Sequence, residues 1–193
     1  HALARRVAEF GYEYFDGDRL LGYGGYHYHP KYWTKTARRF ITHYGLKAGS
    51  RVLDVGCAKG FLLFDLQRLC PGLEVAGLDV SQYAIDNAKP EMKDRLLQGT
   101  ATALPFEDAS FDLVVSISTL SHADRPGCAT ALREITRVSR GSRFITLHAW
   151  ETEEQHARIV MWNLAAQTYM HVAEWRDFLG HVPYDGDYWW WTA

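Results

Sequence analysis

Residues 52–60 read Val-Leu-Asp-Val-Gly-Cys-Ala-Lys-Gly, and this stretch decides the fold. Its first half is an apolar run that predicts a buried strand, and its second half is a turn that opens a helix over residues 61–69. Gly56 and Gly60 let the backbone pass close to a ligand at a place where a Cβ atom would collide with it. The stretch therefore predicts a strand, a tight turn and a helix that together border a binding site.

Asp54 restricts the kind of ligand that this turn can hold. A dinucleotide site brings a pyrophosphate to the start of the helix, and a carboxylate two residues before the first glycine would repel it. The glycine spacing also differs from G-x-G-x-x-G, so a nicotinamide dehydrogenase is the least expected function. A carboxylate suits a ligand that carries an ammonium group, such as the methionine part of S-adenosyl-L-methionine (SAM).

Asp79 ends a second apolar stretch, nineteen residues after Gly60. An acidic residue at about 20 residues past such a turn can accept hydrogen bonds from both ribose hydroxyls of a nucleoside. Asp79 could instead cap the helix that follows, although Ser81 could fill that role. The glycine turn upstream favours the ribose role for Asp79.

The rest of the chain alternates apolar strand patterns with helical patterns. Strands separated by helices predict an α/β fold, with a doubly wound, mostly parallel sheet of six to seven strands and helices on both faces. Ligands bind such sheets at the carboxyl ends of the strands. The predicted strands are 51–54, 75–79, 95–99, 111–116, 143–147 and 188–191, and the predicted helices are 30–44, 61–69, 81–88, 126–139, one from 152, and 172–179.

Composition and charge exclude several function classes. The chain has 193 residues, 23% of them charged, and a net charge of −2, so it offers no broad basic surface to nucleic acid or to an anionic membrane. No apolar run approaches the roughly 20 residues that span a bilayer. Three cysteines in no paired pattern argue against a disulfide framework, which makes the cytoplasm the expected location.

Further motifs follow in a specific order. Residues 104–106 read Leu-Pro-Phe, residues 110–112 read Ser-Phe-Asp before an apolar strand, and residues 132–135 read Leu-Arg-Glu-Ile. With the glycine turn and Asp79, this combination resembles the class I, Rossmann-like SAM-dependent methyltransferases of the small-molecule branch, over residues 45–147. The resemblance implies SAM as the cofactor and methyl transfer to an oxygen or nitrogen atom of a small molecule.

The resemblance also implies a cofactor-binding set. The turn after the first strand would hold the methionine end, Asp79 the ribose, Thr100 and Ala101 the adenine, and two serines the floor near the sulfonium. A lid tyrosine would close over the cofactor. The set is Asp54, Gly56, Cys57, Ala58, Gly60, Asp79, Val80, Thr100, Ala101, Ser116, Ser118 and Tyr26.

The chain departs from the family pattern at four places, one of which is residues 139–142, Ser-Arg-Gly-Ser, where the family usually has a Pro-Gly-Gly turn. Ala58 stands where the family usually has glycine, and Thr100 stands where an acid often binds the adenine amino group. The family sheet also ends in an antiparallel pair of strands, whereas only one strand's worth of sequence follows the last predicted helix. The sheet edge is therefore either shortened or completed by a partner chain.

The family often folds its N-terminal segment over the cofactor, which divides the chain into a lead-in and lid at 1–44 and a SAM-binding domain at 45–193. Residues 22–30 are too rich in glycine for a regular element. Tyr28 and His29 in this lead-in are candidate substrate-binding residues. His27 and His29 make a weak metal pair without a third ligand, so no metal is expected.

His122 is the candidate catalytic residue, because it follows the fourth predicted strand and an imidazole can take a proton near neutral pH. A polar histidine on the rim without a role is the alternative. Trp150, Trp162 and Asn163 follow the fifth strand, where this fold often builds its acceptor pocket, and they complete the candidate substrate-binding set.

Two other functions stay open. An enzyme of the same fold could use the aminocarboxypropyl group of SAM or cyclise it, releasing methylthioadenosine. A non-catalytic subunit could instead support a partner, and the apolar strand at 188–191 favours association, including a homodimer. The sequence does not identify the acceptor.

Overall fold

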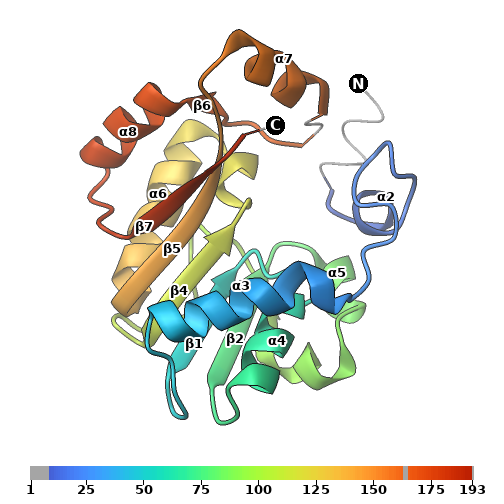
Figure 1. The fold of residues 1–193 in the computed structure, drawn as a ribbon, viewed down its shortest axis with the longest axis vertical. Helices are drawn as coiled ribbons and strands as arrows, with labels where there is room; N and C mark the ends of the chain where they lie inside the picture. Colours follow the sequence, from blue (N-terminus) through green and yellow to red (C-terminus); the bar gives the residue numbers. More distant parts are fainter. Residues whose placement is uncertain (1–8, 163–164, 193) are drawn as a thin grey trace.

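The computed structural model describes residues 9–162 and 165–192. A seven-stranded sheet forms the centre of the molecule, in the order β3-β2-β1-β4-β5-β6, with β7 also paired to β5 (Figure 1). All pairs between these strands are parallel. The strands are β1 (Arg51–Val55), β2 (Glu74–Asp79), β3 (Leu96–Gln98), β4 (Phe111–Ile117), β5 (Ser139–Trp150), β6 (Met170–His171) and β7 (Asp187–Trp191).

Helices connect the strands and cover the sheet. Their limits follow local signals: Pro30 is the first residue of α3, Ser81 caps α5 and Asp124 caps α6. The helices are α2 (Tyr12–Phe15), α3 (Pro30–His43), α4 (Phe61–Leu69), α5 (Gln82–Asp86), α6 (Arg125–Val138), α7 (Glu153–Trp162) and α8 (Val172–His181), with short 3₁₀ turns at Pro90–Arg95 (η1) and Leu120–His122 (η2).

Two hydrophobic clusters, one on each face, hold the helices against the sheet. Phe40 of α3 and Leu66 of α4 belong to one cluster, and Ile135 of α6 and Trp175 of α8 belong to the other. Trp175 is fully buried, and its indole Nε1 donates a hydrogen bond to the His148 carbonyl oxygen at 2.9 Å. The predicted doubly wound α/β fold is confirmed.

The far edge of the sheet differs in detail from the sequence prediction. β7 pairs with β5 in parallel, on the edge opposite β4, since residues 144–146 pair with both strands. Trp189 of β7 is 68% exposed. β5 is longer than the predicted 143–147 at both ends. Its first residues, 139–142, are polar, so they gave no strand signal in the sequence.

The topology brings three strand ends to one edge of the sheet. β1 lies between β2 and β4, and all three run in the same direction. Their carboxyl ends therefore open onto the same region, below the lead-in helix α2 (Figure 1). In the described part of the chain, no helix has the length and apolar character needed to cross a membrane.

Candidate active site

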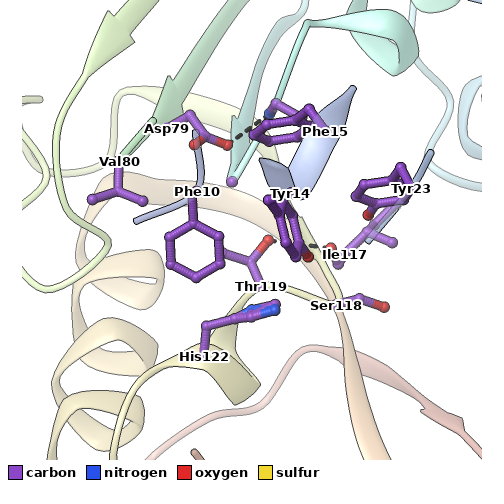
Figure 2. A pocket seen from close by; sticks show the side chains of 12 residues that line it. Phe10, Tyr14, Phe15, Tyr23, Asp79, Val80, Ile117, Ser118, Thr119 and His122 are labelled. Carbon is purple, nitrogen blue, oxygen red and sulfur yellow. Dashed lines mark hydrogen bonds between the residues drawn. The ribbon is translucent and has the colours of Figure 1, made fainter. Parts of the chain in front are cut away.

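A pocket lies where β1, β2 and β4 end (Figure 2). Its cavity is about 90 Å³. Four aromatic side chains of the lead-in form one wall, and the loops after the three strands form the other. The lining residues are Phe10, Tyr14, Phe15, Tyr23, Gly56, Ala58, Asp79, Val80, Ile117, Ser118, Thr119 and His122.

The turn after β1 is held tightly against β2. The backbone N–H groups of Gly56 and Cys57 both donate to the Leu78 carbonyl oxygen, at 2.7 and 3.1 Å. Gly56 has a φ of 86°, and a Cβ atom there would overlap the side chain of Thr119. Glycine is therefore required at this position for both its conformation and its lack of a side chain.

Asp79 connects the first two loops of the site. Its Oδ2 accepts a hydrogen bond from the Ala58 N–H at 2.7 Å, and its Oδ1 accepts one from the Ser81 N–H at 2.8 Å. Burial raises the pKa of Asp79, although these backbone hydrogen bonds oppose the shift. The Ser81 hydroxyl, rather than Asp79, caps α5 by accepting from the Ala84 N–H at 2.9 Å.

Asp54 is a buried carboxyl group with an unsatisfied oxygen. The residue is 5% exposed, and no hydrogen-bond donor in the described part of the chain reaches its Oδ1. Burial, and then the negative charge of Asp79, raise the pKa of Asp54 to about 8. A buried polar atom without a partner is costly, so this oxygen is suited to accept from a donor that a ligand brings.

His122 faces the pocket from the opposite side. Its ring meets Phe10 edge to face, with centroids 5.1 Å apart (Figure 2). The ring centroid of His148 of β5 lies 6.3 Å from that of His122. Burial lowers the pKa of His122 to about 4. The imidazole is therefore neutral near pH 7, with a ring nitrogen able to accept a proton.

The aromatic wall comes from residues to which the sequence analysis gave no role. Phe15 is 3% exposed and stacks on Tyr23 at 5.9 Å, while Tyr14 meets Tyr23 at 5.4 Å and Phe10 at 5.1 Å. Burial raises the pKa of Tyr14. The only sequence signal was the density of aromatic residues in the lead-in, which does not specify the side chains that face the sheet.

Six of the predicted site residues line this pocket together. They come from the turns after β1 and β2 and from the segment after β4. The six residues are Gly56, Ala58, Asp79, Val80, Ser118 and His122.

Other predicted cofactor residues do not line the pocket. The Ser116 hydroxyl is engaged with the Val55 carbonyl oxygen at 2.9 Å, and Cys57 is buried in the core, where burial raises its thiol pKa. A Cβ atom on Gly60 would face Met92, away from the lining. The Thr100 hydroxyl pairs with that of Thr102 at 2.9 Å. Asp54 and Ala101 are also outside the lining set.

Three of the predicted substrate residues, Tyr28, His29 and Trp150, do not line the pocket. The Tyr28 hydroxyl donates to Asp65 Oδ1 at 2.7 Å, and His29 caps α3 by accepting from the Lys31 N–H at 3.2 Å. Trp150 stacks on His156, with ring centroids 4.5 Å apart.

The remaining predicted residues have different positions. Tyr26 packs on Phe61 at 5.0 Å, outside the lining set. Trp162 ends α7, but its side chain and the whole of Asn163 fall outside the described residues. Roles for these two residues stay predictions.

The family model and the curated relatives that match this chain are methyltransferases. The family model described as a methyltransferase domain matches residues 52–141. A demethylmenaquinone methyltransferase of Lactococcus lactis is 32% identical over 177 residues, which cover 86% of this chain and 64% of that protein. A sterol 24-C-methyltransferase of Gibberella zeae is 33% identical over 113 residues, or 55% of this chain and 29% of that protein.

Solved structures agree on the fold. A chain in the complex between the Haloferax volcanii Trm112 methyltransferase activator and a methyltransferase has a TM-score of 0.62 and 25% identity, and the match covers 94% of this chain and 74% of that one. This chain spans less than two thirds of the length of the two curated relatives.

The site fits the cofactor of that family. SAM carries an ammonium group, a ribose and a sulfonium. Asp54 and Asp79 are suited to the first two groups, and Gly56 lines the pocket. The family match begins at Val52 and contains the turn after β1, Asp79 and His122. Residues 52–141 therefore form a Rossmann-like domain that matches the methyltransferase family model.

Proposed function

We propose that this chain binds SAM at the turn after β1 and transfers its methyl group to a small-molecule acceptor held beside His122. One observation carries the proposal. A single pocket is lined on one side by the glycine turn and Asp79 and on the other by a neutral histidine and lead-in aromatics. Cofactor and acceptor groups would therefore meet at the same strand ends.

The cofactor would be held by charge and by close backbone contact. Asp79 would accept from the ribose hydroxyls, and Asp54, whose Oδ1 lacks a donor among the described residues, would pair with the ammonium group. When bound, SAM supplies a methyl group on a positively charged sulfur. Aromatic faces such as that of Tyr14 would stabilise this charge.

The lining favours a neutral and largely apolar acceptor. Of the described lining residues, Asp79 is the only one with an acidic side chain, none is a lysine or arginine, and His122 is neutral near pH 7. Four aromatic side chains and Ile117 supply apolar surface. The names of the two curated relatives, which refer to a quinone and a sterol, support this class of acceptor.

Proton transfer would fall to His122. Bound SAM would supply the methyl group and be left as S-adenosylhomocysteine once its carbon–sulfur bond had broken, and the His122 imidazole nitrogen would take the acceptor's proton. An oxygen or nitrogen atom is the proposed acceptor. The relative named as a 24-C-methyltransferase makes carbon the alternative.

The test is turnover with ¹³C-methyl SAM and a panel of phenols, amines and quinols. We expect S-adenosylhomocysteine as the co-product and a product methyl with the NMR shift of an O- or N-methyl group. A carbon-bound methyl would reassign the acceptor atom. Methylthioadenosine as the co-product would overturn methyl transfer, and absence of both binding and turnover would favour a supporting subunit.

His122→Phe keeps an aromatic ring against Phe10 and removes the base. We expect kcat to fall by about 10²–10⁴-fold, the usual contribution of a general base, with little change in the Kd for SAM. His181→Phe, on the exposed end of α8, is the matched control. An unchanged kcat in His122→Phe would contradict the catalytic role.

A further inference from the structure

A second polar cluster lies outside the lining of the pocket. Lys59 Nζ contacts both carboxylate oxygens of Asp16, at 2.7 and 2.9 Å, and donates to the Tyr26 carbonyl oxygen at 2.8 Å. The Tyr83 hydroxyl donates to Asp16 Oδ2 at 2.6 Å. The side chains of Lys59 and Asp16 are only 7% and 23% exposed. We call Asp16, Lys59 and Tyr83 the latch.

The latch joins three segments that are distant in sequence. Lys59 lies in the turn after β1, directly after Ala58 of the pocket lining, and Tyr83 lies on α5. Asp16 follows α2 in the lead-in and also accepts from the Tyr26 N–H at 2.9 Å. The latch therefore ties the aromatic lead-in directly to the cofactor turn.

Beyond the latch, the lead-in has a separate attachment to the domain. Tyr28 and Thr34 both donate to the fully buried Asp65 of α4, at 2.7 and 2.8 Å. Between the two attachments lie Gly24 and Gly25, with φ values of 67° and 89°. Glycine adopts such angles without strain and allows them to change, so the pair is placed as a hinge. From here on, the lid means residues 10–23 alone, the part of the predicted 1–44 lead-in and lid that supplies the aromatic wall of the pocket.

The closed lid leaves too little room for a nucleoside cofactor. The cavity is about 90 Å³, whereas small-molecule sites usually measure at least ~300 Å³. The wall that reduces it consists of lid residues, since Phe10, Tyr14, Phe15 and Tyr23 all line the cavity. The lid must therefore move away from the strand ends before a cofactor can enter or leave.

We propose that Lys59 is a positioning residue. With Asp16 and Tyr83, it latches the lid over the pocket and thereby controls exchange of the cofactor and its product. The claim about exchange of the cofactor and its product rests on the proposed function, whereas the claim about lid opening does not.

Removal of one latch partner leaves the buried Lys59 or the partly buried Asp16 without its counter-charge, which costs more than loss of an exposed ion pair. Lys59→Met and Asp16→Asn should each favour the open lid. The double variant leaves no charge without a partner. The population of its open lid should therefore be smaller than the sum of the two single-variant effects predicts. Asp18→Asn, in the lid, and Lys35→Met, on α3, make the same chemical changes at exposed sites outside the latch.

Hydrogen exchange of the ligand-free protein measures lid opening directly. The N–H groups of Gly25 and Tyr26, which follow the lid, both donate to the carbonyl oxygen of Phe15 in the lid, so they exchange when the lid opens. We expect their exchange to accelerate at least tenfold (about 1.4 kcal/mol) in both single variants. Amides of β4 and α6 should exchange as in the wild type.

Dissociation of S-adenosylhomocysteine, followed by stopped flow, measures exchange of the product. We expect it to accelerate at least tenfold in Lys59→Met and Asp16→Asn and to stay unchanged in both controls. If the wild type binds no S-adenosylhomocysteine but the lid amides exchange hydrogen faster in the single variants, the latch is supported and the proposed function fails.

The latch would be overturned if Lys59→Met and Asp16→Asn fold and the lid amides of both variants exchange hydrogen no faster than those of the control variants. Should either variant fail to fold, Tyr83→Phe carries the test, because it removes a single hydroxyl from the same carboxylate. We expect a several-fold acceleration of lid exchange in this variant. No acceleration would contradict the proposal.

Discussion

Asp54 has a carboxyl group whose ionised form is destabilised by its buried position. Its pKa is about 8 in the folded chain because burial and the charge of Asp79 both disfavour ionisation. An unfolded chain would release that proton near pH 4. Between these values the folded state binds more protons than the unfolded state, so this residue lowers stability as the pH rises from about 4 to about 8.

Asp54→Asn should therefore stabilise the ligand-free protein and impair its binding. The variant cannot ionise, so its gain in Tm over the wild type should grow between pH 5 and pH 8, by roughly 2–4 °C for each kcal/mol. Thermal unfolding across this range measures the gain, with Asp18→Asn as the exposed control. A gain that does not depend on pH would contradict the assigned pKa.

The same residue predicts proton release on binding. If the ammonium group of the ligand pairs with ionised Asp54, binding must remove the proton that the carboxyl holds below about pH 8. Affinity for S-adenosylhomocysteine should rise by up to tenfold for each pH unit between 6 and 8. Titration calorimetry in buffers of different ionisation enthalpy measures the released proton. Uptake of protons would contradict this pairing.

His122 predicts the acid limb of the rate profile. Its pKa is about 4 because the ring is buried, well below the 6.5 of an exposed histidine. The base should stay neutral, and kcat should stay level, from neutral pH down to about pH 5. A rate that halves near pH 6.5 would mean that the reacting base is exposed to solvent.

At the scale of elements, the turn between β1 and α4 depends on space as well as on conformation. Gly56 and Gly49 have similar φ values, 86° and 82°, but a Cβ atom at Gly49 meets nothing within 4 Å. Gly49→Ala should cost only the left-handed conformation, about 1–2 kcal/mol. Gly56→Ala should cost about 1–3 kcal/mol more, because its methyl overlaps Thr119. Urea unfolding of both variants measures the difference.

Local signals explain which elements the sequence could predict. The helix Phe61–Leu69 was predicted with its observed limits, because Gly60 precedes it and Pro71 and Gly72 follow it. β6 has two residues and α2 has four, so neither is long enough to produce a periodic pattern. The parallel pairing of β7 depends on the path of the chain across the sheet, which periodicity does not record.

The sequence predicted the site residues that belong to motifs at strand ends. It did not predict the contacts between residues that are far apart in the sequence. Asp79 and His122 follow strands whose order brings their ends together, so their meeting follows from topology. Tyr28 was placed at the substrate by its position in the lead-in, but the buried Asp65, thirty-seven residues later, engages its hydroxyl. The sequence gives no sign of that pairing.

The whole molecule is a sheet whose binding edge is covered by its own lead-in (Figure 1). The aromatic side chains of the lid fill the space that a cofactor would need, and the latch holds them there. Binding must therefore include the free energy of opening the lid. Variants that weaken the latch should bind SAM with a faster association rate as well as a faster dissociation rate.

The most direct test of the central claim is calorimetric titration of the folded protein with SAM and with S-adenosylhomocysteine, beside Asp79→Asn and the exposed control Asp86→Asn. The wild type and the control should bind both ligands with a Kd of ~1 μM–1 mM. Asp79→Asn should bind ~10–100-fold more weakly, the effect of one lost charged hydrogen bond. Absence of binding by the folded wild type, or equal affinities of all three proteins, would contradict a SAM site at this turn.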